Sequence, residues 1–225
     1  MIKVTKPRTR SPHRIIYTSS PDRGLEHLLK IWPEIRKAVP DAELEVFYGF
    51  QLFDKFHQGN PASKAWKERI VKLLGQEGIS KHGRLPQHEL EQEMRVCGIW
   101  AYPAHFEEIN CISALKAQAF GCVPIVTSYA ALETSVQFGI KIDCDILLEE
   151  GRDLFKEHLI WLLQHPEWQE EIRKPMMEWG SSITWDKVAA QWKNEFEGKP
   201  TEPIITKPKG AIVKNVNWDG GVSNE

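Results

Sequence analysis

Several features that would assign this 225-residue chain to a class are missing from it. It contains only four cysteines, and no two of them are spaced as CxxC. This pattern argues against a zinc site and against a disulfide framework. Apolar runs are short, since none approaches the roughly 18 residues that span a bilayer, and the N-terminus has no signal-type apolar core. We therefore expect a cytoplasmic protein without a transmembrane segment.

An excess of charge of one sign is missing too. The chain has 29 Lys and Arg residues against 31 Asp and Glu residues, which gives a formal net charge of -2. Because binding along a nucleic acid needs a strong basic excess, no nucleic-acid partner is expected. Two glycine-rich phosphate-binding motifs, GxGxxG and GxxxxGK[ST], are also absent. Their absence argues against a dehydrogenase and against an NTPase with a P-loop.

What the chain does contain is an alternation of strand and helix patterns. Four short apolar runs predict strands, at residues 14–18, 43–48, 79–83 and 99–102. Helical patterns lie between them, at residues 25–39, 64–74 and 86–97, while residues 51–61 are predicted to form a loop. The first helix is the clearest, because apolar residues recur at spacings of three and four, as in a helix that faces a sheet.

This alternation predicts the fold class. Parallel strands need crossover connections, and right-handed crossovers place helices on both faces of the sheet. We therefore predict an α/β fold with a doubly wound, Rossmann-like parallel sheet of about six strands and helices on both faces. The length suits one good-sized domain or one half of a larger two-domain enzyme.

Composition suggests where this domain begins and ends. Residues 1–13 are basic and contain no acidic residue, so they are interpreted as a leader or linker. Residues 14–196 form the predicted domain, which closes with three helical segments rich in tryptophan. Residues 197–225 contain many Pro and Gly residues and little apolar patterning, which predicts a flexible tail or linker.

The residues that follow the predicted strands indicate a ligand site. Ligands of doubly wound folds lie at the carboxyl ends of the strands, so the relevant loops are 19–24, 83–85 and 105–113. Residues 102–128 have the order strand end, polar loop, helix, Gly turn and buried strand. Amides that open such a helix bind phosphate oxygens, and a carboxylate beside them binds sugar hydroxyls. The candidate residues here are Glu108, Ile109, Asn110, Cys111 and Ser113.

The first loop adds a cation to the candidate site. Arg23 lies at the start of the first helix, beside the hydroxyls of Ser19 and Ser20. A guanidinium at this position binds phosphate oxygens in a bidentate manner. The alternative is a surface arginine paired with Asp22 or Glu26.

A thiol nucleophile is not expected. Cys111 lies at a predicted helix N-terminus, where the pKa of a thiol can fall. No motif places a histidine beside it as a base, however, and the surroundings of the other three cysteines are typical of packed, reduced thiols.

Three segments together resemble a known family: SSPDRGLEHLLKIWPEI, HGRLPQHELEQEM and FEEINCISALKAQAFGCVPIVT. They are similar to the C-terminal, nucleotide-sugar-binding domain of retaining glycosyltransferases of family four, which have the GT-B fold. The resemblance covers residues 14–196 and is most specific in the third segment. There the family has a Glu, seven residues and a second Glu, followed by a small-residue helix that ends in Gly-Cys-Pro. Glu108 takes the first of these Glu positions.

The resemblance implies roles for the candidate residues. Glu108 and Arg23 would be the catalytic residues, with Glu108 on the hydroxyls of the transferred sugar and Arg23 on the diphosphate leaving group. The amides of Ile109 to Cys111 would support sugar and phosphate. The loop of Gly83, Arg84 and Leu85 would face the base. Nucleotide sugars of uridine or guanosine are the implied donors.

The chain departs from the family at two positions. Lys116 stands where the family has its second Glu, which holds the ribose hydroxyls. A lysine has donors and no acceptor, so it cannot reproduce that contact. It would bind a ribose oxygen or a phosphate, or else it is a solvated helical lysine. The family's other phosphate-binding arginine also has no counterpart near Tyr17, Ser19 and Ser20.

Neither a metal nor a cofactor is expected from this resemblance. Asp143, Cys144 and Asp145 match the DxD pattern that binds a divalent metal in a different glycosyltransferase fold, and two carboxylates can bind magnesium. The family that the chain resembles has a metal-independent site. We therefore expect the nucleotide sugar as substrate and no metal.

Three functions follow from these observations. The favoured one is the donor-binding half of a retaining glycosyltransferase that transfers a hexosyl group from an NDP-sugar to an unknown acceptor. Its N-terminal acceptor domain is absent from this chain, would act in cis or in trans, and would be needed for activity. The second is a non-catalytic nucleotide-sugar-binding or assembly module, which Lys116 and the missing arginine would explain. The third is an unrelated Rossmann-type epimerase or dehydrogenase, which the missing glycine motif disfavours.

Overall fold

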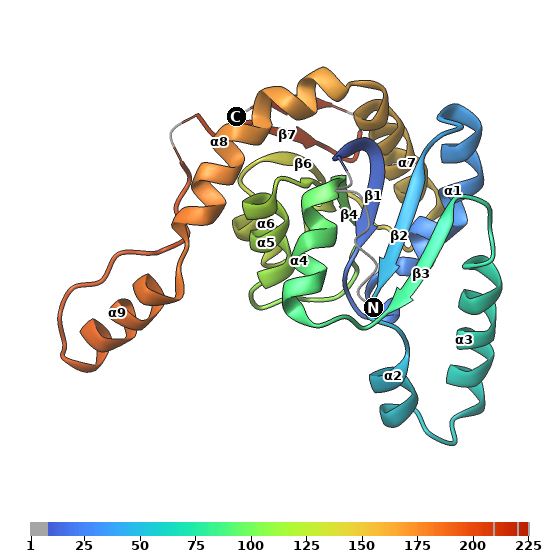
Figure 1. The fold of residues 1–225 in the computed structure, drawn as a ribbon, viewed down its shortest axis with the longest axis horizontal. Helices are drawn as coiled ribbons and strands as arrows, with labels where there is room; N and C mark the ends of the chain where they lie inside the picture. Colours follow the sequence, from blue (N-terminus) through green and yellow to red (C-terminus); the bar gives the residue numbers. More distant parts are fainter. Residues whose placement is uncertain (1–8, 209, 220, 225) are drawn as a thin grey trace, which may run out of the picture.

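The computed structural model describes residues 9–208, 210–219 and 221–224. One sheet organises these residues (Figure 1), with the strand order β3-β2-β1-β4-β5-β6-β7-β8. The strands are β1 (Ser11–Tyr17), β2 (Glu43–Phe47), β3 (Ile79–Gly83), β4 (Cys97–Tyr102), β5 (Val123–Thr127), β6 (Gly139–Ile142), β7 (Val213–Val216) and β8 (Val222–Asn224). Neighbouring strands are parallel except β7 and β8, which are antiparallel. The predicted doubly wound parallel sheet is therefore confirmed.

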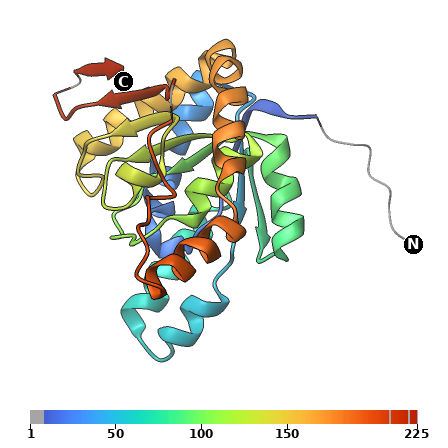
Figure 2. The same ribbon diagram turned by 90° about the vertical axis from the view of Figure 1, so that its left-hand side faces the viewer.

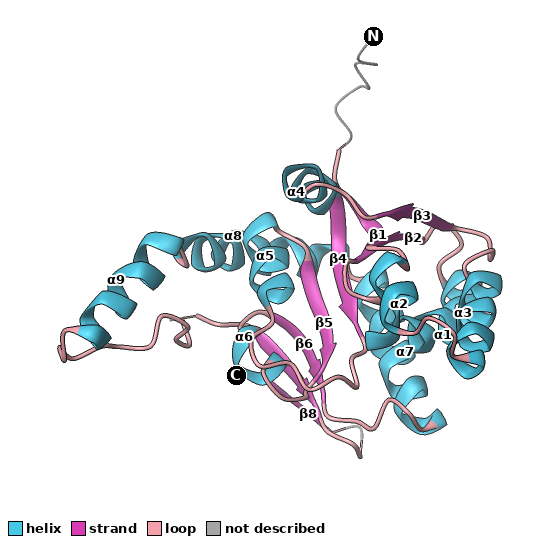
Figure 3. Ribbon diagram, turned by 90° about the horizontal axis from the view of Figure 1, so that it is seen from below, coloured by secondary structure: helices cyan, strands magenta, loops and turns pink. Residues whose placement is uncertain are grey.

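Helices cover both faces of the sheet. They are α1 (Leu25–Ala38), α2 (Gln51–Phe56), α3 (Pro61–Leu73), α4 (Gln87–Val96), α5 (Ile112–Phe120), α6 (Leu132–Ser135), α7 (Glu149–Gln164), α8 (Pro166–Ser182) and α9 (Trp185–Phe196), with a short 3-10 helix η1 (Pro21–Arg23). Helices α1, α3 and α7 lie together on one face, and α4, α5 and α8 lie together on the other (Figure 3). This is the two-sided arrangement that the alternating pattern predicts.

The core lies on both sides of the central strands. Every residue of β4 and of β5 is buried, and so are the last three residues of β1. Strands buried on both faces have near-continuous apolar sequences, which is why these runs were recognisable. The apolar stripe of α1, which includes Leu25, Leu28 and Trp32, is buried against the sheet. Each such side chain contributes about 1.5–3 kcal/mol of transfer free energy on burial.

The sheet has eight strands rather than the six or so that the sequence predicts. The additional strands, β7 and β8, come from the segment that was predicted to be a tail or linker, and Figure 2 shows them beyond β6 at one edge of the sheet. In β7 only Val213 and Val216 are buried. A four-residue strand with two polar residues has no apolar run, so the pattern was too weak to indicate a strand.

One predicted loop contains a helix. Residues 51–61 include α2, which buries a single residue, Phe53. A six-residue helix with one buried position lacks the repeat by which a longer helix is recognised. Together α2 and α3 form a helical hairpin: α2 and the start of α3 lie beyond the carboxyl ends of the strands, and α3 then runs back beside the sheet (Figure 1).

The start of the described chain is fixed to the domain by Arg10. Its guanidinium donates hydrogen bonds to the carbonyl oxygens of Cys97 at 2.6 Å, of Gly121 at 2.7 Å and of Phe120 at 2.7 Å. These carbonyls end α5 and open β4, so Arg10 joins three segments. Of the predicted basic leader, residues 1–8 lie outside the described residues.

Helix α9 stands apart from the rest of the domain (Figure 1). None of its residues is buried, and three aromatic side chains along it are exposed: Trp185 by 75%, Trp192 by 60% and Phe196 by 82%. Among the described residues, no helix has the length and apolar character that a membrane crossing requires. The aromatic side chains of α9 thus lie on a helix that packs little against its own domain.

Candidate functional site

The candidate site lies where the direction of chain winding changes. Strands β1 and β4 are neighbours in the sheet, and the chain proceeds from them toward opposite edges. In doubly wound folds the crevice at the carboxyl ends of such a strand pair receives the ligand. The loop after β1 and the loop after β4 meet at this point, and both contain predicted site residues.

Gly24 allows these two loops to approach closely. Its φ of +123° lies in a region that favours glycine, and a Cβ atom there would lie 2.2 Å from the carbonyl oxygen of Pro103. Any other residue at position 24 would therefore push the loops apart. The contact between backbones brings Arg23 opposite the loop that holds Glu108.

Arg23 and Glu108 form an ion pair across this contact. The Nη1 atom of Arg23 lies 3.2 Å from Oε1 of Glu108, which also accepts a 2.7 Å hydrogen bond from the hydroxyl of Tyr102. Tyr102 in turn lies 3.3 Å from the hydroxyl of Ser19. The guanidinium of Arg23 stacks 4.0 Å above the centre of the Phe106 ring. The alternative pairing, of Arg23 with Asp22 or Glu26, does not occur: Arg23 pairs with Glu108, and Glu26 pairs with Lys30.

The electrostatics of the pair keep Arg23 charged and leave it accessible. Burial is the largest single influence on the pKa of Arg23 and lowers it, but Glu108, Tyr102 and Asp22 together raise the pKa above its ordinary value. The Arg23 side chain is 37% exposed, whereas that of Glu108 is 13% exposed. Arg23 can therefore offer its remaining N–H groups to an anion without leaving Glu108.

Unused backbone donors lie directly after Glu108. Within residues 9–208, 210–219 and 221–224, the N–H groups of Ile109, Asn110 and Cys111 have no hydrogen-bond acceptor. They precede α5, whose N-terminus adds the positive end of the helix dipole. Ile109 is 98% exposed, so its amide faces solvent. The segment has the free donors that an anion site requires.

Cys111 has no character of a nucleophile. Its side chain is 4% exposed, and burial raises the pKa of its thiol to about 12. The thiol is therefore protonated at neutral pH. Its place at the start of α5 does not offset the burial.

A cavity of about 410 Å³ lies at the ends of β1, β2 and β3 and against the first turns of α5, the helix that follows the Glu108 loop. Its walls contain four of the predicted site residues: Arg84, Leu85, Ser113 and Lys116. The walls also contain Thr18, Phe47, Tyr48, Leu90, Met94 and Ile112, which were not predicted. Phe47, Tyr48, Arg84 and Leu85 come from the ends of β2 and β3, Leu90 and Met94 come from α4, and Ile112, Ser113 and Lys116 come from α5.

Two predicted residues lie outside this arrangement. The hydroxyl of Ser20 caps no backbone group of η1, and the Ser20 carbonyl accepts a hydrogen bond from Tyr17 at 2.9 Å. Gly83 ends β3 with a φ of +70°, and its carbonyl accepts the backbone N–H of Tyr48 at 2.7 Å. Gly83 therefore shapes the cavity through its backbone.

Lys116 lies between two hollows of the surface. Its ammonium is 3.5 Å from the carboxylate of Glu91 on α4, a distance at which the pair is weak. Lys116 and Ile112 line both the 410 Å³ cavity and a more apolar groove of about 730 Å³ between α5, the end of α8 and α9. Lys116 thus faces the candidate site from the second turn of α5.

A histidine pair was missed by the sequence analysis. Nε2 of His27 on α1 lies 3.1 Å from Nδ1 of His105, in the loop that follows β4. Burial lowers the pKa of His27 to about 4, so this ring is neutral at pH 7. Nothing in the sequence indicates the pair, because the two residues are separated by 78 positions.

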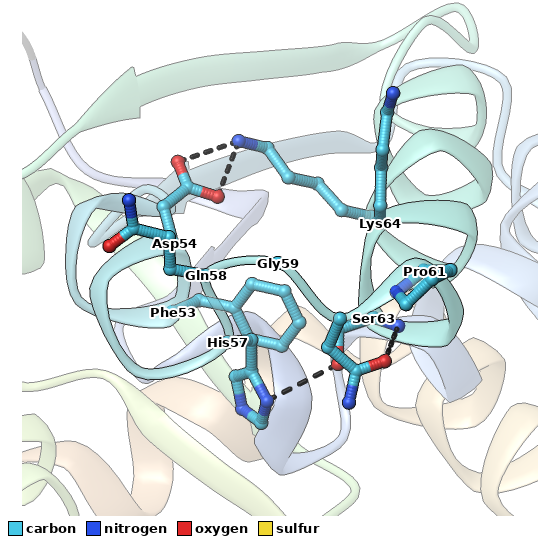
Figure 4. A pocket seen from close by; sticks show the side chains of 10 residues that line it. Phe53, Asp54, His57, Gln58, Gly59, Pro61, Ser63 and Lys64 are labelled. Atoms are coloured by element: carbon cyan, nitrogen blue, oxygen red, sulfur yellow. Dashed lines mark hydrogen bonds and ion pairs between the residues drawn. The ribbon is translucent and has the colours of Figure 1, made fainter.

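A hollow elsewhere has a different character. It measures about 470 Å³, lies between α2 and α3, and is shown in Figure 4. Its polar groups bind one another: Asp54 pairs with Lys67 at 2.6 Å, and Ser63 lies 3.2 Å from His57. These groups already have partners, and the hollow lies on the projecting hairpin away from the β1–β4 crevice.

The Asp143, Cys144 and Asp145 segment follows β6. The carboxylate of Asp145 accepts the backbone N–H of Leu147 at 2.9 Å, as in a turn. No group of three or more His, Cys, Asp or Glu residues in the described part of the chain has metal-binding geometry.

Comparison with known proteins identifies the family. The model of the family described as glycosyl transferases group 1 matches residues 15–178. This range begins within β1 and extends past the end of α7, so it includes the ion pair and the residues that line the cavity. The chain belongs to this family. No curated protein sequence matches the chain.

Solved structures of glycosyltransferases share the fold. One is the pneumococcal O-GlcNAc transferase GtfA in complex with UDP and GlcNAc, with a TM-score of 0.66, 16% identity, and coverage of 84% of this chain and 36% of that one. Another is sucrose-phosphate synthase from Thermosynechococcus elongatus, with a TM-score of 0.66, 15% identity, and coverage of 82% and 45%. A third is Anabaena HepE in complex with UDP-glucose, with a TM-score of 0.64, 13% identity, and coverage of 83% and 49%.

These matches confirm the predicted family and fold. The domain has the architecture of one half of a GT-B glycosyltransferase, and it spans less than half the length of these three structures.

Proposed function

We propose that this glycosyltransferase-family domain binds the nucleotide-sugar donor of a retaining enzyme that transfers a hexosyl group. One observation carries the proposal: Glu108 is held by Arg23 and Tyr102 next to three unused backbone N–H groups, and the helix that follows them, α5, lines a 410 Å³ cavity through Ile112, Ser113 and Lys116. Carboxylate, guanidinium and amides at one place suit a ligand that has both sugar hydroxyls and phosphates.

The parts of the donor can be assigned to parts of the site. The nucleoside would occupy the cavity, with its base at the end formed by Phe47, Leu85 and Leu90. The diphosphate would lie against the amides of residues 109–111 and the free N–H groups of Arg23. The sugar would then lie at Glu108. Several structures with the same fold are complexes with UDP or a UDP-sugar, which supports a uridine nucleotide as the first candidate.

Lys116 gives the diphosphate a further cation. It faces the cavity from α5, where its three N–H groups can donate to a phosphate or a ribose oxygen. Its weak pair with Glu91 would be exchanged for the ligand. We propose a phosphate contact, because an anion gains more from an ammonium than a hydroxyl does.

The chemistry would be substitution at the anomeric carbon on the face from which the diphosphate leaves. The bond from this carbon to the diphosphate oxygen breaks as the acceptor oxygen forms its bond, and the acceptor proton passes to the departing phosphate oxygen. Arg23 and the amides would stabilise the charge that develops on the phosphate. Glu108 would hold the sugar and favour positive charge near the anomeric carbon.

Transfer would need an acceptor domain that this domain does not provide. The exposed aromatic side chains of α9 and the apolar groove beside Lys116 are suitable for contact with such a domain, in cis or in trans. We therefore propose little or no transfer by this domain alone. We also propose a metal-independent site, since Arg23, Lys116 and the amides supply positive charge.

Calorimetric titration of the chain with UDP, GDP, ADP and their hexose derivatives tests the proposal. We expect saturable binding of at least one nucleotide sugar, unaffected by EDTA. Glu108→Gln should lower the affinity for the nucleotide sugar more than the affinity for the free nucleotide, because it removes the contact to the sugar. Glu107→Gln is the matched control, since Glu107 is exposed and lies one residue away. No binding of any nucleotide or nucleotide sugar would refute the proposal.

The second candidate is a binding or assembly module without catalytic activity. Lys116, in place of the family's second Glu, favours it. The two candidates differ in one assay: together with its acceptor domain, an enzyme releases nucleoside diphosphate from the donor, and Arg23→Met or Glu108→Gln abolishes that release. A module shows no release with either variant or with the unchanged chain.

A further inference from the structure

The backbone of Tyr48 is strained. Its φ is +97°, and among the described residues the only other non-glycine residue with positive φ is Ala130. A bulky side chain disfavours this region, which glycine adopts freely. The neighbouring structure maintains the conformation, because the N–H of Tyr48 donates to the carbonyl of Gly83 at 2.7 Å and Gly49 follows with a φ of +73°.

The ring of Tyr48 has no role in the hydrophobic core that would account for the strain. It is half-buried and belongs neither to the hydrophobic core nor to the side chains packed against that core. Within the described residues its hydroxyl has no hydrogen-bond partner. The ring instead forms part of the wall of the 410 Å³ cavity. Retention of a costly conformation at a cavity indicates a contact with a ligand.

The surroundings of the ring indicate which part of a ligand it contacts. The guanidinium carbon of Arg84 lies 5.9 Å from the centre of the Tyr48 ring. Tyr48, Phe47, Arg84 and Leu85 come from the ends of β2 and β3, on one side of β1, whereas Ser113 and Lys116 come from α5, which follows β4 on the other side of β1. Aromatic rings and guanidinium planes both stack on nucleobases. A base that enters this cavity would therefore find its stacking partners at Tyr48 and Arg84, and a phosphate would find a cation at Lys116.

We propose that Tyr48 is a specificity-determining residue that stacks on the base of the nucleotide and favours a single-ring pyrimidine over a two-ring purine. The strained backbone fixes how far the ring extends into the cavity, and the ring takes up space that a second ring of the base would need. This inference rests on the proposed function, because it assumes that the cavity receives a nucleoside.

Replacing Tyr48 by glycine distinguishes a contact with the ligand from a structural role of the ring. Tyr48→Gly removes the ring and also the strain, so the melting temperature should not fall while the affinity for UDP does. Loss of one base-aromatic stack weakens binding by roughly 5- to 150-fold. The ratio of UDP to GDP affinity should fall as well, because the cavity becomes larger at the base end.

Three further variants complete the experiment, each titrated with UDP and GDP and melted. Tyr48→Phe keeps the stacking face and should keep the affinity ratio. Tyr48→Ala loses the ring without relieving the strain, so it should show the weaker affinity without the gain in melting temperature. Phe56→Ala is the control, because Phe56 is 77% exposed on α2 and lies outside the cavity.

The outcomes separate this inference from the proposed function. If the unchanged chain binds UDP and Tyr48→Gly leaves the UDP to GDP ratio unaltered, the role of Tyr48 is refuted and the proposed function stands. A clear fall in the melting temperature of Tyr48→Gly would also refute it, since the ring would then be structural. If the unchanged chain binds no nucleotide, both are refuted.

Discussion

Replacing Arg23 by methionine tests the charge arrangement of the site most directly. Methionine keeps most of the length of the side chain and removes the guanidinium, which bonds Glu108 at 3.2 Å and is 37% exposed. Because Arg23 is more than a third exposed and solvent screens its charge, the free energy of unfolding should change by less than about 1 kcal/mol. Glu108 keeps its 2.7 Å hydrogen bond from Tyr102, so it is not left without a partner.

Ligand binding should respond far more strongly to Arg23→Met than stability does. A hydrogen bond to a charged group contributes about 1.5–3 kcal/mol, which corresponds to roughly a 10- to 150-fold change in affinity. The affinity for UDP should fall by this factor, whereas the affinity for uridine, which has no phosphate, should equal that of the unchanged chain. Arg23→Lys should give an intermediate loss, because an ammonium cannot form the bidentate contact.

Isothermal titration with UDP and uridine, at two salt concentrations, measures these effects. The loss for UDP should shrink as salt rises, because the contact with Arg23 is only partly buried. Equal losses for UDP and uridine would refute the reasoning, since Arg23 would then support the nucleoside or the loop. An unchanged UDP affinity would refute it as well.

Three further results are expected. Arg10→Ala removes the guanidinium that donates hydrogen bonds to three backbone carbonyls, so the free energy of unfolding measured in urea should fall by about 3 kcal/mol. A fall of less than about 1 kcal/mol would contradict this role of Arg10. The pKa of His27 is about 4 in the folded chain against an ordinary 6.5, so its ring is neutral when folded. The folded state is therefore at full stability above pH 6.5 and loses up to about 3 kcal/mol of unfolding free energy as the pH falls from 6.5 to 4. His27→Gln should flatten the dependence of the melting temperature on pH over this range. An unaltered dependence would contradict the role assigned to His27. Burial raises the pKa of all four thiols, so alkylation at pH 8 should be much slower in the native chain than in urea, and equal rates would count against buried thiols.

Elements with long apolar repeats were predictable from the sequence, and elements without them were not. The stripe through Leu25, Leu28 and Trp32 indicated α1, because its period is that of a buried helix face. Strand β7 has only Val213 and Val216 on its buried side, and α2 has only Phe53. Their positions come from contacts with the rest of the domain, which a local pattern does not contain.

The same distinction applies to the candidate site. Glu108 and Arg23 were recognisable through their loops and their family resemblance, but their ion pair joins positions 85 residues apart. Tyr102 was predicted to end a strand and does so, but the strand pattern did not indicate that its hydroxyl reaches Glu108. Tyr48 likewise ended a predicted strand, since a backbone angle of +97° leaves no trace in the sequence.

The late position of β7 in the chain matters during translation. Strand β6 ends at Ile142, but its outer neighbour β7 begins only at Val213, after α7, α8 and α9. At a synthesis rate of about 5–20 residues per second, the edge of β6 remains without its partner for several seconds after it leaves the ribosome. An open strand edge is a template for pairing with another chain. The nascent protein would therefore be most prone to aggregation late in synthesis, when chaperones that shield strand edges would matter most.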